Sequence, residues 1–403
     1  MYSENILILT YWPVDDALIQ TYVLPYAKII RVNLSANKKI WLQTFEREAA
    51  DHRKSNLIRE RLLKVGISWI RFQYSSFGLN AIFQGVINLV KLLLFVRTNR
   101  IGIIHVWCTP PGVTGYILSV LTGAKLVIDS YEPHAESMVE NGSWNRGSLK
   151  FTFLFFFEKL MSRHAKVIIS ATAGMKDYAR ISYGVNLNSF YVKPACVDLK
   201  LFNLSKSKNV QLLKSMDLVD KVILVYAGKI GGIYLGREIF DLAKIAHEFY
   251  GERFRMLLLS GSGRVEIEKY CLSSGLSPEI VVSKFVSHAD IPEYIGLADF
   301  ALTPIKSVPT KRYCTPIKDG EYWAMGLPIL ITKDISDDSL IVERENIGAV
   351  IETLDKRGYT TALVKIDQLL RSDRIILRTK IRAVAERYRS FKLARQIYSK
   401  IYH

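Results

Sequence analysis

Cysteine is scarce in this sequence, and no two cysteines lie close together. The four residues, Cys108, Cys196, Cys271 and Cys314, are scattered over 403 positions. Such scatter excludes the close cysteine pairs that build structural zinc sites and redox motifs. We therefore expect free thiols and a reducing compartment.

Long uncharged apolar runs are also lacking. The two most apolar stretches, residues 88–96 and 151–161, fall short of the roughly 18 to 20 uncharged residues that a membrane-spanning helix needs. The first residues read MYSENILILTYW, without a basic leader or a small-residue cleavage site, so we expect no secretory signal. These absences predict a cytoplasmic protein, with peripheral contact at the inner face of the cell membrane as a further expectation.

Acidic residues are outnumbered by basic ones. The chain has 55 Lys and Arg against 38 Asp and Glu, a net charge of +17, which favours an anionic partner such as a phosphate-bearing substrate or an anionic membrane. No nucleic-acid-binding module is recognisable, so we expect no nucleic-acid partner. Hydrophobic residues make up 49% of the chain, which excludes disorder as the main state and suffices for two domains.

Short apolar runs alternate with longer amphipathic segments, and the alternation starts twice. Near-continuous apolar strands separated by helices indicate parallel sheets covered on both faces. In the first half we expect strands at residues 6–9, 39–43, 103–107, 125–129 and 166–170. In the second half we expect them at 222–226, 255–259, 281–285, 300–303 and 329–332. The predicted fold class is α/β, with two doubly wound, Rossmann-like domains.

The predicted domain boundary lies in a stretch rich in Ser, Lys and Asn around residues 203–220. We expect an N-terminal domain over 1–203 and a C-terminal domain over 204–385. Two such domains in series predict a ligand cleft between the carboxyl ends of their sheets.

The loop YAGKIGGIYLGREIF, residues 226–240, follows a predicted strand and opens a helix. Gly228 and the glycines after it would let backbone N–H groups approach a phosphate, and Lys229 adds a positive charge. A flexible turn with a solvated lysine explains the same residues, and the sequence favours neither interpretation over the other. The later pair Gly261 and Gly263 is a lone G-x-G, for which a tight turn is favoured.

The stretch TPIKDGEYWAMGLPILIT, residues 315–332, puts three charged residues before an apolar strand. Glu321 is expected in the first turn of a helix that ends near Gly326, with Pro328 preventing its continuation. A carboxylate at that point can stabilise the helix end, or it can accept hydrogen bonds from two ribose hydroxyls. The residues alone favour neither role of Glu321 over the other, and they suggest no role for Asp319.

Four ionisable residues gather at the end of another predicted strand, in VIDSYEPHAESM: Asp129, Glu132, His134 and Glu136. Burial and neighbouring charges can tune pKa values at such a point, so function is slightly favoured over a solvated loop. His134 is the one residue of the four whose ordinary pKa lies near neutrality. A single histidine among carboxylates has no recognised ligand spacing, so we expect no bound metal.

Asp15 and Asp16 follow the first predicted strand. They could bind hydroxyls of an acceptor or cap the helix that starts after them, and capping is favoured for one of the two. Both are therefore candidate acceptor-binding residues.

Basic and aromatic residues mix in two further segments, residues 75–100 and 143–166. Such segments could lie on an anionic lipid surface, with Phe and Leu inserted and Lys and Arg at the headgroups. A core helix with a solvated basic end explains the same letters, and we favour it.

These elements, in this order, resemble the family 4 glycosyltransferases of the GT-B fold over nearly the whole chain. The most specific match is PIKDGEYWAMGLP, which is similar to the family pattern Pro-x-Lys-x-x-Glu-Tyr-x-Ala-x-Gly-x-Pro. YAGKIGGIYLGREIF and LLLSGSGR resemble the family's two glycine loops, and KLVIDSYEPHAE occupies the expected place in the first half. The resemblance implies a GT-B architecture, with residues 386–403 as a helix that packs back on the N-terminal domain.

The resemblance also implies a donor site in the second domain. Lys229 would neutralise the diphosphate of a sugar nucleotide, and Gly228 would allow backbone approach. Glu321 would bind the ribose hydroxyls, and the backbone near Lys284 and Phe285 would hold the base. His134 or Glu132 of the first domain would face the reacting sugar. Such enzymes generally retain the anomeric configuration and need no metal or other cofactor, because cationic side chains stabilise the leaving diphosphate.

The sequence departs from the family pattern at two informative positions. Leu235 stands where a lysine is common, so Lys311, Arg312 or Lys318 would have to supply that phosphate contact. Tyr313 replaces the earlier of two glutamates. We predict a glycosyltransferase that uses a nucleotide-sugar donor and a glycan or lipid-linked acceptor. The alternatives are a sugar-nucleotide epimerase on the same fold and a non-catalytic nucleotide-sugar-binding scaffold.

Overall fold

The computed structural model describes residues 4–16, 18–47, 52–75 and 78–402, and the chain folds as two compact units. Unit 1 runs to Pro194 and takes up the chain again at Lys392, and unit 2 is Ala195–Phe391. The expected boundaries at 203/204 and 385/386 lie several residues from these. Val197 and Phe202 pack in the core of unit 2, which is why the first boundary falls before them.

Unit 1 contains a seven-stranded, fully parallel sheet in the order β3-β2-β1-β4-β5-β6-β7. Its inner strands are apolar and buried on both faces, as parallel strands covered by helices must be. The strands are β1 (Asn5–Leu9), β2 (Ile40–Glu46), β3 (Ile67–Gln73), β4 (Ile101–Trp107), β5 (Lys125–Tyr131), β6 (Val167–Ser170) and β7 (Phe190–Val192).

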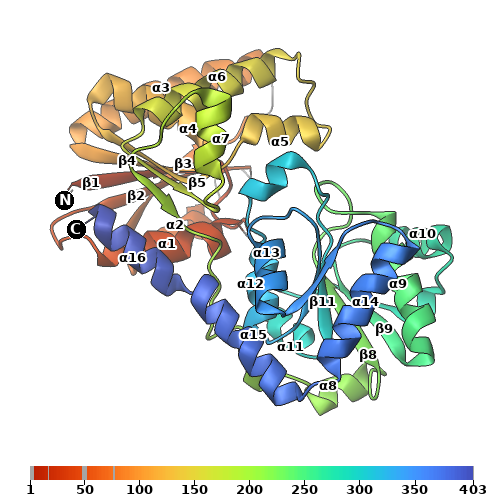
Figure 1. Ribbon diagram of the computed structural model, residues 1–403. Coiled ribbons are helices and arrows are strands. Elements are labelled where there is room, and N and C mark those ends of the chain that lie inside the picture. The colour runs from red at the N-terminus through yellow and green to blue at the C-terminus, as the bar shows by residue number, and fades with distance from the viewer. Residues whose placement is uncertain (1–3, 17, 48–51, 76–77, 403) are drawn as a thin grey trace. The chain divides into compact units, whose positions relative to one another are not determined.

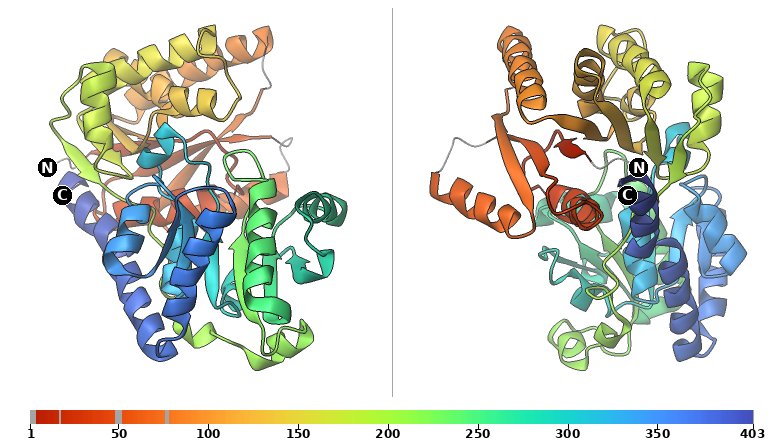
Figure 2. Two further views of the ribbon diagram at one scale, coloured as in Figure 1. Left: turned by 45° about the vertical axis from the view of Figure 1, so that its right-hand side comes forward. Right: turned by 90° about the vertical axis from the view of Figure 1, so that its left-hand side faces the viewer.

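Helices cover both faces of this sheet. Figure 1 shows α3, α4 and α6 on one face and α1 and α16 on the other, and the views of Figure 2 agree. The helices are α1 (Leu24–Val32), α2 (His52–Leu63), α3 (Leu79–Thr98), α4 (Thr109–Thr122), α5 (His134–Glu140), α6 (Leu149–His164), α7 (Met175–Tyr178) and α16 (Phe391–Tyr402). From Lys392 on, α16 therefore belongs to unit 1 although it ends the chain.

Unit 2 contains a six-stranded parallel sheet in the order β10-β9-β8-β11-β12-β13. Its strand order reverses beside β8, and ligands of open α/β sheets bind at the carboxyl ends of strands next to such a reversal. The strands are β8 (Val222–Ala227), β9 (Phe254–Leu259), β10 (Val281–Lys284), β11 (Phe300–Thr303), β12 (Ile329–Thr332) and β13 (Gly348–Ile351).

The helices of unit 2 bury two separate cores against the two faces of its sheet. One core lies under α11, α12, α13 and α15, and the other lies under α9, α10 and α14. The helices are α8 (Val210–Ser215), α9 (Arg237–Tyr250), α10 (Arg264–Ser274), α11 (Ile291–Ile295), α12 (Ile317–Ala324), α13 (Asp338–Glu345), α14 (Lys356–Leu370) and α15 (Arg374–Tyr388). Together the two units confirm the predicted α/β class with two doubly wound domains.

Three strands, β3, β7 and β13, were not expected from the sequence. All three are edge strands, which pair on one side only. In β3, buried and part-buried side chains alternate and include Arg71, while β7 is only three residues long. Short or partly polar strands do not produce the continuous apolar run by which the inner strands are recognised, which accounts for β3 and β7. β13 is a buried apolar run of four residues, like the expected β11 and β12, so this reason does not apply to it.

Helix α3 corrects the expectation that no segment is long and apolar enough to cross a membrane. Over Asn80–Thr98 it meets that criterion by length and composition, and it is the one helix among the described residues that does. Two cations, Lys91 and Arg97, interrupt the apolar run in the sequence but do not end the helix.

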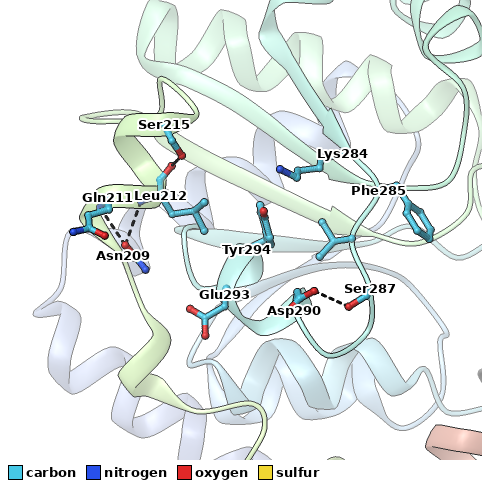
Figure 3. Close-up of a pocket in the computed structure, with 11 residues that line it drawn as sticks. Asn209, Gln211, Leu212, Ser215, Lys284, Phe285, Ser287, Asp290, Glu293 and Tyr294 are labelled. Atoms are coloured by element: carbon cyan, nitrogen blue, oxygen red, sulfur yellow. Dashed lines mark hydrogen bonds between the residues drawn. The ribbon is translucent and has the colours of Figure 1, made fainter.

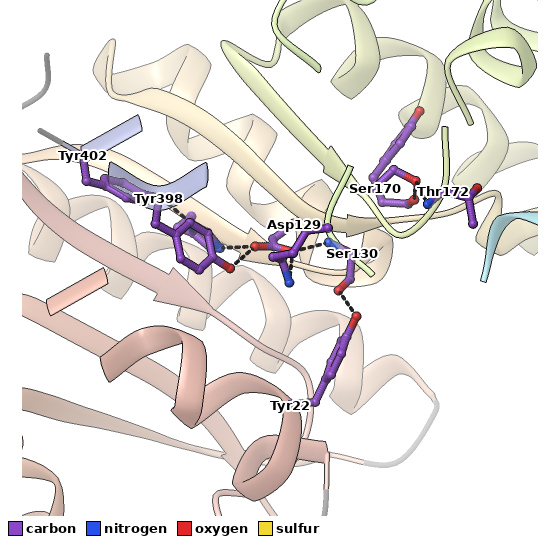
Figure 4. A network of polar contacts seen from close by, with 10 residues as sticks. Tyr22, Asp129, Ser130, Ser170, Thr172, Tyr398 and Tyr402 are labelled. Carbon is purple, nitrogen blue, oxygen red and sulfur yellow. Dashed lines mark hydrogen bonds and ion pairs between the residues drawn. The ribbon is translucent and has the colours of Figure 1, made fainter. Parts of the chain in front are cut away.

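A buried ion pair fastens α16 to the sheet of unit 1. Lys193 Nζ lies 3.1 Å from Asp129 Oδ1 and 3.7 Å from the centre of the Tyr26 ring, and Asp129 and Lys193 are both fully buried. The hydroxyl of Tyr398, on α16, donates to Asp129 Oδ2 (Figure 4), and His105 Nε2 lies 3.5 Å from the same oxygen. Burial alone would raise the pKa of Asp129, but Lys193, His105 and Tyr398 bring it below its usual value.

We expect Lys193→Met to destabilise unit 1 by roughly 3–5 kcal/mol, because it leaves the Asp129 carboxylate buried without its cation. The partly exposed pair of Lys125 with Glu4, at 3.4 Å, provides the control: Lys125→Met should cost less than about 1 kcal/mol. Urea unfolding followed by circular dichroism measures both. Adding Asp129→Asn to Lys193→Met should restore part of the loss, and equal effects of the two lysine variants would contradict the assignment.

Candidate functional site

The glycine loop of unit 2 begins where β8 ends, and Gly228 is sterically required there. Its φ of +154° is one that L side chains rarely adopt, and its N–H donates to Leu259 O at 2.9 Å. A Cβ at this position would lie 2.7 Å from Lys318 Nζ and 3.0 Å from the Tyr226 hydroxyl. The loop therefore passes directly against the Lys318 amine.

Lys318 is a buried cation without a polar partner. Its side chain extends from α12 between two aromatic rings, with Nζ 3.9 Å from the centre of Tyr234 and 4.9 Å from that of Tyr226. The residue is 7% exposed, and Nζ makes no hydrogen bond to any described residue. Burial lowers the pKa of Lys318 to about 8. An amine held in this way offers unused donors to an anion that enters beside Gly228.

Glu321 lies one turn beyond the start of α12, which corrects its expected place in the first turn. Pro316 is the N-cap, so the helix begins at Ile317 and Asp319 is the carboxylate of the first turn. Glu321 Oε1 lies 3.3 Å from His288 Nε2, and this hydrogen bond raises the pKa of His288. His288 belongs to the segment after β10, so Glu321 connects α12 with that segment rather than stabilising a helix end.

Asp319, which the sequence left without a role, belongs to a buried structural network. Its carboxylate accepts from Thr303, and burial with the neighbouring Asp338 carboxylate raises its pKa well above the usual range. Asp338 in turn accepts from Arg389, whose guanidinium also donates to Ala195 O at 3.3 Å. The network ties α12 to α13 and to the ends of unit 2, and so holds Lys318 and Glu321 in place.

The other predicted donor-binding residues lie at the surface of unit 2. Lys229 is exposed on the glycine loop, and its carbonyl accepts from the Tyr226 hydroxyl. Figure 3 shows the side chains of Lys284 and Phe285 diverging after β10. Both line a cavity of about 660 Å³ beside α8 and α11, and Phe285 is 78% exposed. Lys229, Lys318 and Glu321 do not line this cavity.

One of the two positions that depart from the family pattern, Leu235, has a structural explanation. Leu235 is buried in the core beneath the glycine loop, so this position contributes packing. Arg312 pairs with Asp334 at 2.8 Å on the surface, and Lys311 is largely buried. Of the three cations that could replace the missing lysine, Lys318 is the one that contacts the loop at Gly228.

In unit 1, the four ionisable residues after β5 separate into three environments. Asp129 points inward to Lys193, and Glu136 pairs with Arg146. Glu132 and His134 remain together, with Glu132 Oε1 3.5 Å from His134 Nδ1. Both side chains are about one quarter exposed, which leaves them accessible at the start of α5. The structure therefore keeps the predicted His134 and Glu132 pair and removes Asp129 and Glu136 from it.

A buried carboxylate, that of Glu158, holds the backbone beside this pair. Glu158 of α6 is fully buried, and its Oε1 accepts the Ala135 N–H at 3.0 Å while Oε2 accepts from the Tyr183 hydroxyl at 2.9 Å. Burial raises the pKa of Glu158 to about 7, although these two hydrogen bonds and the nearby His134 act against the increase. Sequence reasoning missed Glu158 because it stands in an aromatic run, and the residues that it contacts are distant in the chain.

Asp15 and Asp16 have local partners in unit 1. Asp15 pairs with Lys54 at 3.2 Å and with Arg61 at 3.7 Å, both on α2. Asp16 accepts the Leu18 N–H at 2.8 Å, a turn that opens the following helical segment. The N-cap of the helical segment Ile19–Val23 is Leu18, without a side-chain cap, so the expected capping by one of the two aspartates is not observed. Acceptor binding by either stays a prediction.

Within the described parts of the chain, no group of three or more His, Cys, Asp and Glu side chains is placed to hold a metal ion. All four cysteines are free. Lys229 stands on the glycine loop, and the Lys318 amine lies against it at Gly228. The chemistry that this arrangement supports is electrostatic: positive charge, backbone N–H groups and a carboxylate at one edge of a parallel sheet.

Comparison with known proteins places the fold. No family model matches the chain, and no curated protein matches it. Three solved structures share its fold over 98% or more of both chains. They are a sucrose-phosphate synthase from Thermosynechococcus elongatus (14% identity, TM-score 0.72), Anabaena HepE in complex with UDP-glucose (15%, 0.71) and WaaG, a glycosyltransferase involved in lipopolysaccharide biosynthesis (13%, 0.68). At these identities the likeness establishes the fold, which is GT-B.

Gly228→Ala tests the close approach of the loop to Lys318. The added Cβ meets Lys318 Nζ at 2.7 Å in a strained backbone conformation, so we expect a loss of roughly 1–3 kcal/mol in stability of unit 2. Gly261→Ala is the matched control, because its Cβ would have one contact, with Phe285 at an ordinary 3.8 Å. Thermal unfolding compares the two, and a melting temperature lowered equally in both variants would refute the steric argument.

Glu158→Gln tests the buried carboxylate. Because the folded state keeps a proton on Glu158 up to about pH 7, this residue stabilises the fold below its ordinary pKa and loses that contribution as the pH rises from about 4.5 to about 7. The glutamine cannot titrate, so unfolding of the variant should depend less on pH. Urea midpoints at pH 5 and pH 8 measure this, with exposed Glu279→Gln as control. Parallel pH profiles for wild type and Glu158→Gln would exclude the proposed titration.

Proposed function

We propose that this protein is a glycosyltransferase that transfers a sugar from a nucleotide-sugar donor to an acceptor. The observation that carries the proposal is the buried amine of Lys318, which has no polar partner and lies against a glycine loop at the carboxyl edge of the sheet of unit 2. Such an amine is costly to bury unless an anion binds it. A sugar nucleotide brings a diphosphate with the required charge.

In this proposal the parts of the donor follow the residues around Lys318. The diphosphate lies at the glycine loop, where Gly228 leaves room and Lys318 and Lys229 supply charge. Glu321 accepts hydrogen bonds from the ribose hydroxyls, and His288 orients the Glu321 carboxylate. The backbone after β10, near Lys284 and Phe285, holds the base. Positive charge from side chains stabilises the leaving diphosphate, so the proposed reaction is metal-independent.

For unit 1 we propose that His134 or Glu132 acts on the reacting sugar. The two side chains are accessible and within reach of one another, and Glu158 holds the backbone of the turn that carries them. A histidine oriented by a carboxylate can exchange a proton near neutral pH. We propose retention of the anomeric configuration, because the sequence resembles the family 4 enzymes.

The proposed acceptor is a glycan or a lipid-linked glycan intermediate at the cytoplasmic face of the membrane. Two structures with this fold support such a class: HepE was solved with UDP-glucose, and WaaG is involved in lipopolysaccharide biosynthesis. The net charge of +17 suits both a phosphate-bearing donor and an anionic surface.

A non-catalytic scaffold is the second candidate, and Leu235 and Tyr313 favour it, since both depart from the pattern of the enzymes. An epimerase would use the same donor site. Product analysis separates the three: transfer yields a glycosylated acceptor, epimerisation changes the donor sugar without an acceptor, and a scaffold binds the donor without changing it.

Lys318→Met and Glu321→Ala test the donor site. Each removes a charged partner, so we expect the affinity for the best ligand in a panel of UDP, GDP, ADP and CMP sugars to fall roughly 10- to 100-fold. Wild-type affinity should also fall as the pH rises above about 8, because binding must then return a proton to Lys318, and Lys318→Met should lose this dependence. Isothermal titration calorimetry measures both effects, with exposed Lys214→Met on α8 as control.

Two negative binding results would have different meanings. If no nucleotide sugar binds the wild type, the donor site itself is refuted. If Glu321→Ala binds as the wild type does while Lys318→Met does not, the anion site stands without the ribose contact.

A further inference from the structure

One face of unit 1 is built from helices that are almost free of acidic residues. From Arg61 to Ile128 the sequence has no Asp or Glu but has seven Lys and Arg. Helices α3 and α4 lie within this range, and α6 packs beside α4, with the rings of Tyr116 and Phe157 6.0 Å apart. The one acidic residue in the three helices is Glu158, which is buried. The three helices therefore carry cations but no exposed carboxylate of their own.

Apolar side chains point outward from the same layer. On α3, Ile82, Val86, Val90 and Leu94 recur every fourth residue and form one stripe, and each is 50% or more exposed. Phe83, 68% exposed, widens the stripe. This corrects the sequence-based preference for a buried helix, because only 17% of the apolar window of α3 is buried.

Helix α6 repeats the pattern. Leu149, Phe153 and Phe156 are spaced by four and three residues and are 88%, 57% and 54% exposed. Aromatic residues of this size normally bury most of their surface in a soluble domain. Repeated exposure at helical spacing on two helices of one layer marks an interaction surface rather than scattered exposed residues.

Cations accompany the exposed apolar residues on both helices. Lys91 and Arg97 lie on α3, and Lys150, Lys159 and Arg163 lie on α6. We call the outward side of these two helices the α3–α6 face. An apolar stripe beside cations suits a surface that has negative charge outside and hydrocarbon beneath.

We propose that the α3–α6 face docks on an anionic lipid bilayer. Phe83 and Phe153, with the aliphatic residues beside them, insert at the level of the headgroups, and Lys91 and Arg163 pair with lipid phosphates. Charge complementarity selects this occupant over a second copy of the chain, because two copies meeting through this face would bring like charges together.

The packing of α3 indicates that it lies on the bilayer and does not cross it. Asn88, Leu92 and Val96 form a buried stripe along the opposite side of the helix. The neighbouring Phe95 packs against Trp41 of β2, with ring centres 5.4 Å apart. Crossing the membrane would pull these residues out of the core of unit 1. The helix is therefore held in the fold by one side and free to contact lipid by the other.

The proposal does not depend on the proposed glycosyl transfer. The α3–α6 face belongs to unit 1, and the candidate donor residues all belong to unit 2. Variants of the face should therefore keep nucleotide affinity, and variants of the donor site should keep lipid binding. Failure of one proposal leaves the other standing.

Vesicle co-sedimentation tests the docking. The full-length protein is mixed with vesicles of phosphatidylcholine alone or with added phosphatidylglycerol, at low and high salt. We expect binding only to the anionic vesicles, weakened by salt. The double variant Phe83→Ser/Phe153→Ser should bind these vesicles at least roughly tenfold more weakly. Lys91→Glu/Arg163→Glu should bind at least roughly thirtyfold more weakly.

Matched controls change exposed apolar residues and exposed cations elsewhere. Leu272→Ser/Ile375→Ser removes two side chains that are 71% and 77% exposed in unit 2, and Lys214→Glu/Lys269→Glu reverses two exposed cations there. Both controls should bind as the wild type does. Thermal unfolding confirms that each variant is folded.

Four outcomes would overturn the proposal. They are no binding to anionic vesicles at low salt, an equal loss in the controls, resistance of the bound protein to alkaline carbonate extraction, and a dimer in lipid-free solution that Phe83→Ser/Phe153→Ser dissociates. Resistance to carbonate would show a spanning helix, and such a dimer would show that a second copy covers the face.

Discussion

A buried charge must find a partner, and this requirement organises the region around both candidate sites. In unit 1, Asp129 turns inward to Lys193, and the pair holds α16 through Tyr398. Asp129 also accepts the Ser130 N–H at 2.6 Å, which directs the chain toward Glu132 and His134. In unit 2, the Asp319, Asp338 and Arg389 network holds α12 in the same way. Neighbouring charges thus position the residues that remain accessible.

Lys318 is an exception to the requirement that a buried charge has a partner. Its amine is as buried as those of the structural networks, yet it lies between two aromatic rings and makes no hydrogen bond to a described residue, although the Asp319 and Glu321 carboxylates are near. Ring faces attract a cation but cannot satisfy its N–H donors. The absence of a side chain at Gly228 lets the loop backbone lie against this amine, and an anion is the partner that we propose for it.

The comparison between sequence and structure separates two kinds of signal. Inner strands were predictable because burial on both faces requires continuous apolar runs, whereas edge strands such as β7 carry little of that signal. The sequence did not decide whether the apolar stripe of α3 is buried or exposed, since both kinds of stripe have the same composition. His288, Tyr234 and Glu158 were missed for a similar reason, because each acquires its role from residues distant in the chain.

The sequence by itself determined the two parallel α/β units, the glycine loop after β8 and the motif that carries Lys318 and Glu321. These features depend on residues that are close together in the sequence, through hydrophobic periodicity and turn-forming residues. Only the tertiary structure decided which charges are structural and which are available: Asp129 and Asp319 are paired in the interior, while Lys318 is buried without a polar partner. That distinction depends on what surrounds each group in space, because burial, not residue type, sets the cost of a charge.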